Sequence, residues 1–306
     1  MSLDPFADLE SDDNEIVDLD LDTEGDIKAE ANDLIALIDA DTLAFAGCLN
    51  CEQQEPLLPR EMYSDNEWGE IISNPNYDAN TDSIWTLNMN EALENCIMRI
   101  QRIYDKTGTR ECELHFTAGR ECFRYEVADS YKANRKGRPP TDLGKLKVEL
   151  NKLYKGSICR EIEADDIVVY LKNLHPEKYL MVAVDKDLLY SVVGTHFNYY
   201  ESIQHEIDMK YVTVDADTAM KWAYKQCLMG DSVDGIKGCK GVGKVGANNA
   251  IDPCTTDLEC WEAVVNLYEA KGMSIIDAIT NMRLVNMYQY DGEKVVLWMP
   301  PKELII

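Results

Sequence analysis

The sequence predicts an α/β fold with a mainly parallel central sheet flanked by helices, followed by a small helical domain. Near-continuous apolar runs at Leu34–Ile38 and Tyr179–Val184 are typical of strands buried on both faces. Residues 88–105 and 164–174 instead repeat apolar side chains at helical spacing. Because alternating strands and helices build parallel sheets with helices on their faces, these observations together define the fold class.

The first half of the chain holds two predicted strands. The strand at Leu34–Ile38 leads into a short helix. Residues 49–87 have several prolines and asparagines and little periodicity, so we expect a long loop of the functional or disordered kind. The helix at 88–105 precedes a second strand at Leu114–Phe116, and residues 118–138 form a polar, basic connection.

The second half begins with Pro139-Pro140, which can open the first turn of a helix. A mostly buried helix at Ala164–Leu174 then precedes the strand at Tyr179–Val184. From about Thr213 the pattern is helical only. The predicted helices there are Ala216–Met229, Val245–Ile251, Leu258–Ala270 and Ile275–Met287.

Length and charge divide the 306 residues into three predicted parts. Single cores stop growing at roughly 250 to 300 residues, so one large and one small domain are expected. The parts are an acidic disordered tail at 1–32, an α/β domain at 33–212, and a helical domain with a C-terminal extension at 213–306. Residues 1–30 hold twelve acids against one lysine and few apolar side chains, a composition typical of disorder.

No stretch of the sequence is long and apolar enough to span a membrane, and the acidic N-terminus differs from a secretory signal. We therefore expect a cytoplasmic protein with no membrane partner. The ten cysteines include one CxxC pair, Cys48 and Cys51, without the second pair or the paired histidines of a zinc set. Reduced, mostly buried thiols are the simpler interpretation.

The net charge of -26 argues against a simple nucleic-acid binder, because a field of that sign repels a polyanion. The charge is unevenly distributed, however. Residues 120–160 carry eleven Lys or Arg against five acids, which provides a cationic path on an acidic body.

Four separated clusters of acids carry the main functional signal. They are Asp39 with Asp41, Glu163 with Asp165 and Asp166, Asp185 with Asp187, and Asp231 with Asp234. Two clusters follow predicted strands, and ligands of parallel sheets gather at the carboxyl ends of the strands. Converging carboxylates repel each other, and hard divalent cations such as Mg²⁺ or Mn²⁺ remove that penalty. Two such ions roughly 3.5 to 4 Å apart are the standard device for phosphodiester cleavage, so the acids suggest a metal-dependent nuclease.

A solvated surface or a helix cap explains any one of these acidic pairs taken alone. Four pairs at the ends of predicted elements favour a common site instead. Asp185 and Asp187 are two residues apart and can face the same side of a strand end. Glu163 and Asp166 are three apart and are neighbours on a helix face.

A glycine-rich loop follows the last acidic cluster and leads into a helix that starts near Lys244. Its glycines match no dinucleotide-binding fingerprint, because no suitable strand precedes them. Such a loop lets backbone N–H groups approach phosphate, and the helix N-terminus adds a favourable field. A flexible loop without a ligand is the alternative.

The motifs LIDAD, FRYEVADSYKANR, EIEADD, VAVDKD and GDSVDGIKGCKGVGKVGA occur in this order. Their combination resembles the 5′-3′ exonuclease and flap endonuclease family of PIN-like nucleases, especially its phage-encoded members, over about residues 33–250. The resemblance implies a nuclease domain with an arch region at about 120–160. It also implies a helix-three-turn-helix at the glycine loop, within a DNA-binding helical domain.

Carried over residue by residue, the resemblance implies two metal ions, Mg²⁺ or Mn²⁺. The first ion would be held by Asp39, Glu163 and Asp165. The second would be held by Asp185, Asp187 and Asp234. Asp166 and Asp231 would ligate directly or through water.

The resemblance also implies roles for basic and glycine residues. Arg124, Lys132 and Arg135 correspond to catalytic side chains that steer the scissile phosphate. The glycine loop would grip the duplex backbone and can hold a K⁺ ion. The residues expected to bind DNA are Lys136, Lys237, Gly238, Gly241, Gly243 and Lys244.

One position departs from the family pattern. Many members have an aspartate after the second strand, in a stretch resembling FDAKG, where this chain has Thr117. The first ion therefore loses an expected carboxylate. Thr117 acting through a water and Asp41 acting as a substitute are the open alternatives.

The sequence thus predicts a structure-selective 5′ nuclease acting on DNA with a 5′ end, flap or junction, or on RNA in RNA-DNA hybrids. Phage DNA replication, recombination and host DNA degradation are the expected settings. A DNA-junction binding protein that has lost turnover is the alternative, motivated by Thr117. A third reading is a protein that binds partners, such as replication proteins, through its acidic tail.

Overall fold

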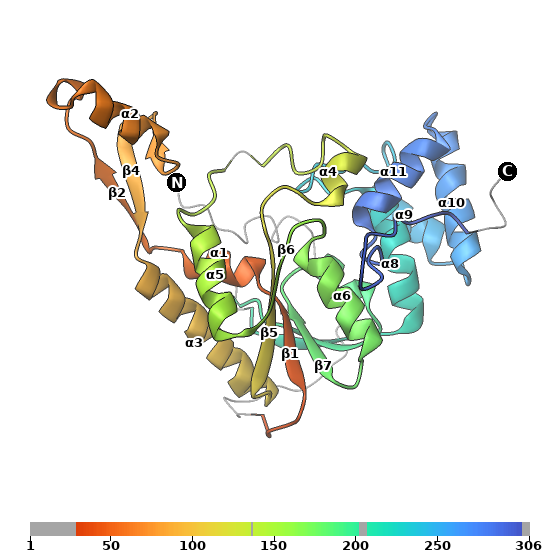
Figure 1. The fold of residues 1–306 in the computed structure, drawn as a ribbon. Helices are drawn as coiled ribbons and strands as arrows, with labels where there is room; N and C mark the ends of the chain where they lie inside the picture. Colours follow the sequence, from red (N-terminus) through yellow and green to blue (C-terminus); the bar gives the residue numbers. More distant parts are fainter. Residues whose placement is uncertain (1–28, 136, 202–206, 302–306) are drawn as a thin grey trace.

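The computed structural model describes residues 29–135, 137–201 and 207–301. Its centre is a six-stranded sheet in the order β6-β5-β1-β7-β8-β9, parallel except for the β8–β9 pair. Helices cover both faces of the sheet (Figure 1), so the predicted α/β fold class is confirmed. The strands are β1 (Ile35–Asp39), β5 (Glu111–Thr117), β6 (Lys155–Cys159), β7 (Tyr179–Ala183), β8 (Gly194–Asn198) and β9 (Lys210–Val214).

Alternate residues of the buried strands face opposite helical layers. In β1, Ala36 and Ile38 belong to the core shared with α1 (Asp41–Gly47), α3 (Met89–Thr107) and α5 (Leu143–Leu153). Leu37 points the other way, into the core shared with α6 (Ala164–Leu174) and α7 (Lys186–Ser191). This two-residue alternation with both faces covered explains the continuous apolar runs in the sequence.

The C-terminal helices pack around a core of their own. It includes the fully buried Tyr224, Trp261 and Tyr268. A turn-rich loop over residues 230–243 joins the first two helices, as the glycine-rich sequence predicts. The helices are α8 (Ala216–Met229), α9 (Lys244–Ile251), α10 (Asp257–Ala270) and α11 (Ile275–Val285). The domain boundaries at 33–212 and 213–306 stay a prediction.

The long loop predicted at 49–87 is instead a folded arm that projects from the body (Figure 1). It contains a second, three-stranded antiparallel sheet in the order β2-β4-β3. The prediction was wrong because these strands are short, polar and largely exposed, so they lack the apolar pattern of a buried sheet. Its elements are β2 (Glu52–Pro56), η2 (Arg60–Met62), α2 (Asp65–Ser73), β3 (Tyr77–Asp78) and β4 (Ser83–Leu87).

Three further expectations concern thiols, membranes and the tail. All ten cysteines lie in the described ranges, and each is buried and unpaired, as predicted. Among the helices that the structure describes, none has the length and apolar character to cross a bilayer. Most of the predicted acidic tail, residues 1–28, lies outside the described residues, and so does Lys136.

Candidate metal and nucleic-acid site

The parallel strands bring distant acids to one edge of the sheet. β1 ends at Asp39, which is opposite His115 in the register with β5. Its other neighbour, β7, runs in the same direction and is followed by Asp185. The carboxyl ends of these strands therefore share one edge, as predicted from the apolar runs.

Two helices that start at this edge supply further acids. Glu163 is the N-cap of α6 and Asp166 is its third residue, and each side chain accepts a hydrogen bond from the backbone N–H of the other. Asp165 lies between them in the first turn. Asp185 is the N-cap of α7, where its carboxylate accepts the N–H of Asp187 at 2.7 Å. Asp185 and Asp187 thus belong to a helix start rather than to a strand end.

The electrostatics show that the clusters converge. Burial, and then the charge of Asp41, raise the pKa of Asp39 to about 8. The pKa of Asp165 lies well above its usual value because of burial and the charges of Asp39 and Glu163. For Asp187, burial and the charges of Asp185 and Asp231 act in the same direction. Acids far apart in sequence therefore repel each other across one small volume.

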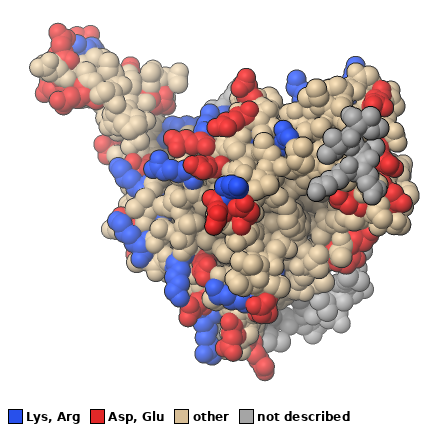
Figure 2. Space-filling view, turned by 45° about the vertical axis from the view of Figure 1, so that its right-hand side comes forward, with Lys and Arg blue, Asp and Glu red and all other residues tan. Residues whose placement is uncertain are grey.

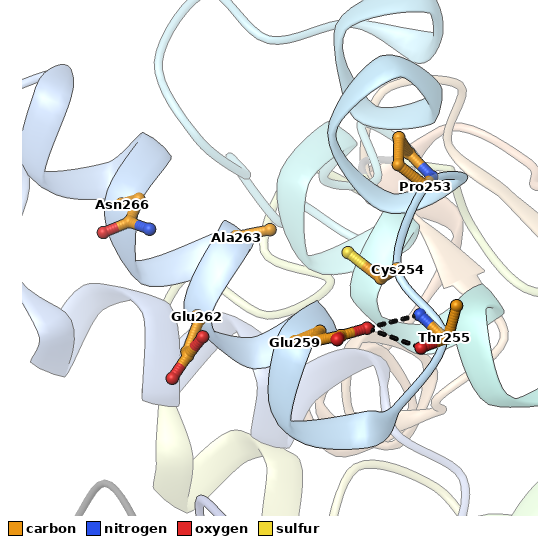
Figure 3. A pocket seen from close by; sticks show the side chains of 7 residues that line it. All are labelled: Pro253, Cys254, Thr255, Glu259, Glu262, Ala263 and Asn266. Carbon is orange, nitrogen blue, oxygen red and sulfur yellow. Dashed lines mark hydrogen bonds between the residues drawn. The ribbon is translucent and has the colours of Figure 1, made fainter.

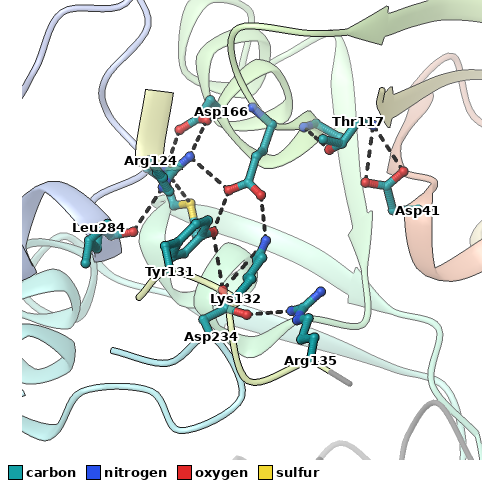
Figure 4. A network of polar contacts seen from close by, with 12 residues as sticks. Asp41, Thr117, Arg124, Tyr131, Lys132, Arg135, Asp166, Asp234 and Leu284 are labelled. Carbon is teal, nitrogen blue, oxygen red and sulfur yellow. Dashed lines mark hydrogen bonds and ion pairs between the residues drawn. The ribbon is translucent and has the colours of Figure 1, made fainter. Parts of the chain in front are cut away.

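Glu163 differs from these acids because cations surround it. Figure 4 labels its partners Arg124, Tyr131 and Lys132, which lie close together. Lys132 Nζ lies 2.5 Å from its Oε1, and Arg124 Nη1 lies 3.1 Å from its Oε2. Tyr131 donates its hydroxyl to the same Oε2 at 2.7 Å. Against the opposing effect of burial, Lys132 and Arg124 lower the pKa of Glu163 to about 2.

Arg124 is engaged inside the protein in this structure, and its expected role in steering a phosphate stays a prediction. Its side chain is fully buried and forms two hydrogen bonds with Asp166, at 2.7 and 2.8 Å. It also donates to the carbonyls of Leu284, in the last turn of α11, and of Asn286, the C-cap of that helix. Every donor is engaged inside the protein.

Asp166, expected to ligate an ion directly or through water, is engaged in the same pair, and its ligand role stays a prediction. It has no exposed surface and both its oxygens are held by Arg124. Burial raises the pKa of Asp166 more than Arg124 lowers it, and the pair stays closed to solvent. Asp166 thus anchors the start of α6.

The loop after α8 brings the last acids beside the basic segment. Arg135 and Lys132 approach the two oxygens of Asp234, at 2.5 and 3.7 Å. The backbone N–H of Lys132 also donates to the Asp234 carbonyl at 2.7 Å. Asp231 instead accepts the backbone N–H groups of Val233 and Asp234 at 2.7 and 3.2 Å, which shapes the loop.

Five of the clustered acids have no cationic partner within the described ranges, and one of them, Asp231, is occupied by backbone N–H groups. The other four are Asp39, Asp165, Asp185 and Asp187. We call them the open carboxylates. Asp39 is buried and the other three are partly exposed. Their oxygens and their mutual repulsion fit a hard divalent cation. Among the described side chains, however, no three Asp, Glu, His or Cys groups already stand in the arrangement of a complete ligand set.

Thr117 stands where the resemblance expects an aspartate, and its hydroxyl already has a partner. Its hydroxyl accepts the backbone N–H of Ala164 at 3.0 Å, so it caps the start of α6. Asp41, the other alternative, accepts the backbone N–H of Thr117 and lies 2.7 Å from Lys147 Nζ. Both residues are therefore engaged in holding β5, α5 and α6 together near the open carboxylates.

Three glycines of the glycine-rich loop are of two kinds: one is buried against backbone, and two are exposed. Gly238 has φ of 62° and is buried, and a Cβ there would lie 2.4 Å from the backbone nitrogen of Gly230. Gly238 thus shapes the loop in this structure, and its expected contact with DNA stays a prediction. Gly241 and Gly243 are exposed with open space beside them, and Lys237 and Lys244 are exposed too.

Two residues that sequence reasoning missed are Tyr131 and Lys147. Tyr131 lies between Glu163 and Asp234, and Lys147 pairs with Asp41. Tyr131 lies in the motif FRYEVADSYKANR, in which the charged residues carry the stronger functional signal. Lys147 carried no signal beyond its place in a basic region.

A separate hollow on the helical part is not connected to this site. Figure 3 shows the side chains that line it, from the turn after α9 and from α10. Its volume is about 340 Å³. Glu259, one of its lining residues, is held by hydrogen bonds to Thr255. None of its lining residues belongs to the acid clusters.

The solved structures most informative about this fold are nucleases of bacteriophage T5. A mutant of the T5 5′-exonuclease matches with a TM-score of 0.54 at 15% identity, covering 85% of this chain and 90% of that chain. The T5 flap endonuclease in a pseudo-enzyme-product complex with DNA and metal ions matches with 0.54 at 18% identity, covering 86% and 94%. T5 5′-exonuclease with bound zinc ions matches with 0.53 at 16% identity, covering 84% and 90%.

No family model matches the chain, and no curated protein matches it in sequence. The structural likeness covers most of both chains, so the protein has the fold that the resemblance predicted. At this identity the likeness establishes the fold, and the residues of the site must carry any argument about activity.

Proposed function

We propose that the protein is a metal-dependent nuclease that hydrolyses phosphodiester bonds of DNA near a 5′ end. The single observation that carries the proposal is the group of open carboxylates. Burial and mutual repulsion raise their pKa values, as for Asp39 and Asp187, which is unfavourable unless a cation joins them. The T5 enzymes of the same fold, with metal ions or with DNA and metal ions, support the proposal.

Two divalent cations, Mg²⁺ or Mn²⁺, are proposed. Asp39 and Asp165 fit the first site and Asp185 and Asp187 fit the second, whereas Glu163 and Asp234 join only when their ion pairs open. Ions bound there would supply an activated water and neutralise charge on the phosphate.

Lys132 and Arg135 are proposed to exchange partners during substrate binding. In the structure they neutralise Glu163 and Asp234 at the edge of the site. Once released from these carboxylates, the two cations would face the phosphate and stabilise charge that builds on it. Tyr131 would hold Glu163 in place through its 2.7 Å hydrogen bond.

The exposed part of the glycine loop is proposed to bind the duplex. Gly241 and Gly243 present backbone without side chains, and Lys237 and Lys244 add positive charge. A K⁺ ion between loop carbonyls and phosphate belongs to the same proposal. The substrates would be DNA with a 5′ end, flap or junction, or RNA-DNA hybrids, in the cytoplasm and in phage DNA replication, recombination or host DNA degradation.

One observation favours a second candidate, a DNA-junction binding protein with lost turnover. Thr117 stands where the family resemblance expects a carboxylate, and its hydroxyl is used to cap α6. The first ion would then have one ligand fewer, which lowers its affinity.

Digestion of end-labelled duplex and 5′-flap substrates separates the two candidates. Cleavage from the 5′ end with Mg²⁺ or Mn²⁺, abolished by EDTA, is the result expected of the nuclease. Flap binding without cleavage under either metal would favour the junction binder. Neither binding nor cleavage would reject both.

A further inference from the structure

The arm, residues 52–87, is a folded unit with its own internal contacts. Trp68 lies at its centre, with the rings of Tyr63 and Tyr77 at 5.8 and 6.3 Å. Ser64 and Glu67 form a capping box that fixes the start of α2. The arm therefore holds a defined shape.

The root of the arm is attached to the basic segment of the body. Arg138 lies 4.6 Å from the ring centre of Trp85 and 2.9 Å from Glu52. Glu52 also accepts the backbone N–H of Thr141 at 2.6 Å. These contacts set the direction in which the arm projects from the body.

The outer half of the arm exposes apolar side chains that nothing in the described chain covers. No residue of α2 is buried. Leu58, Met62 and Ile72 are 59%, 68% and 51% exposed. One face of α2 carries the packed Trp68, whereas the exposed apolar side chains gain no core from the arm, so their surface is unpartnered.

The charge of the arm defines what could cover that surface. It carries eight acids against one basic residue, Arg60, which already pairs with Asp65. Figure 2 shows acids gathered at the tip of the projection. Nucleic acid is repelled by such a field, and so is a second copy of a chain with net charge -26.

We propose that the arm is a docking surface for a partner protein that presents Lys and Arg side chains around an apolar patch. The acids steer and orient that partner, and Met62 with Ile72 supplies apolar contact area. This role is separate from the proposed nuclease site, because none of the open carboxylates lies in the arm.

A labelled synthetic amphipathic helix of leucine and lysine is the probe, and fluorescence anisotropy gives its Kd. The acidic variant is Glu61→Gln with Glu70→Gln, two exposed arm residues. Its matched control is Glu262→Gln with Glu269→Gln on α10, an equal change of charge at exposed positions of the body. The apolar variant is Met62→Ser with Ile72→Ser, and its control is Met98→Ser with Ile276→Ser, which are 57% and 69% exposed.

Each arm variant should raise the Kd of the helix about tenfold, whereas each control should change it less than about twofold. A helix with glutamate in place of lysine should not bind. Equal losses in arm and control variants would show attraction by overall charge alone and overturn the proposal. Absence of binding to the unaltered protein would overturn it as well.

Discussion

Two groups of carboxylates at the same edge of the sheet have opposite electrostatic states. Glu163 is surrounded by Lys132, Arg124 and Tyr131, and the two cations lower its pKa to about 2. Asp39 faces Asp41 and Asp185, and burial with these charges raises its pKa to about 8. The cations Lys132 and Arg124 therefore neutralise only one side of the site. We propose that cations from solution neutralise the other side.

The same contrast separates the acids that hold the fold together from those that are open to ligands. Asp166 and Arg124 form a closed, fully buried pair. Asp185 and Asp187 remain partly exposed, and Asp187 is held by the side-chain amide of Gln226 rather than by a cation. The paired acids build the start of α6, whereas the open ones are available to ligands.

The largest expected effect comes from removing open carboxylates. Asp185→Asn with Asp187→Asn should lower the cleavage rate on the order of 10,000-fold, because the second ion loses its ligands. DNA affinity should be kept or improved, since charges that repel phosphate disappear. The measurement is single-turnover cleavage of a labelled 5′ flap.

The matched control for this pair is Asp215→Asn with Asp217→Asn at the start of α8. These acids have the same spacing and also belong to a helix start. The control should retain full activity. If both pairs lost activity equally, the open carboxylates would have no special role.

Breaking the closed pair should act on stability. Arg124→Met leaves Asp166 buried without its partner, and the free energy of unfolding should fall by about 3–5 kcal/mol. Arg135→Met breaks a partly exposed pair with Asp234 and should cost about 0–1 kcal/mol. Urea unfolding monitored by circular dichroism measures both.

A second substitution makes the test of the closed pair specific. Arg124→Met combined with Asp166→Leu removes both charges and should recover part of the lost stability. Additive losses in the double variant would mean that the ion pair is not the reason for the effect of Arg124→Met.

The buried histidine His196 adds a pH dependence of its own to any stability measurement made to follow the acids. Burial lowers its pKa to about 4. Its Nε2 lies 2.6 Å from the Val192 carbonyl and must carry the proton, while Nδ1 has no partner. The unfolded chain therefore binds a proton below pH about 6.5 that the folded protein accepts only near pH 4, so stability falls as the pH decreases through this window.

The expected size of this loss is about 2 kcal/mol between pH 8 and pH 5. His196→Gln should reduce, without abolishing, the pH dependence of the urea midpoint over that range, because burial also lowers the pKa of His115 to about 4. An unchanged slope would assign the pH dependence to other groups.

Two glycines of the loop differ in the space around them: Gly238 is packed against backbone, and Gly243 has open space beside it. Gly238→Ala places a Cβ against the backbone of Gly230 and should reduce stability without reaching DNA. Gly243→Val has open space and an ordinary φ of -102°, so the protein should fold normally. Its larger side chain should keep phosphate away and raise KM about fivefold at constant kcat. A fall in kcat alone would place the loop in the catalytic site.

The sequence was sufficient for the elements whose apolar pattern is strong. The helix predicted at Ala164–Leu174 has those same bounds, because its buried side chains recur at helical spacing. The strand before Asp185 was predicted because both of its faces are covered. These two elements place the acids, so the convergence followed from local pattern and sheet topology together.

The remaining features depend on contacts between distant parts of the chain. Arg124 bonds to residues 42 and 160 positions away, and nothing local distinguishes it from Lys132 or Arg135. Gly238 is closed because the end of α8 returns against it. The arm was missed because its strands pair with each other outside the main core, where no apolar alternation is required.

Calorimetric titration of the metal-free protein with Mn²⁺ tests most directly whether the open carboxylates form the metal site. We expect saturable binding, which Asp185→Asn abolishes or weakens strongly at the second site. Arg135→Met should leave binding intact or tighten it, because Asp234 is then free to join. Identical isotherms for the unaltered protein and Asp185→Asn, or no binding to the unaltered protein, would contradict the claim that the open carboxylates form the metal site.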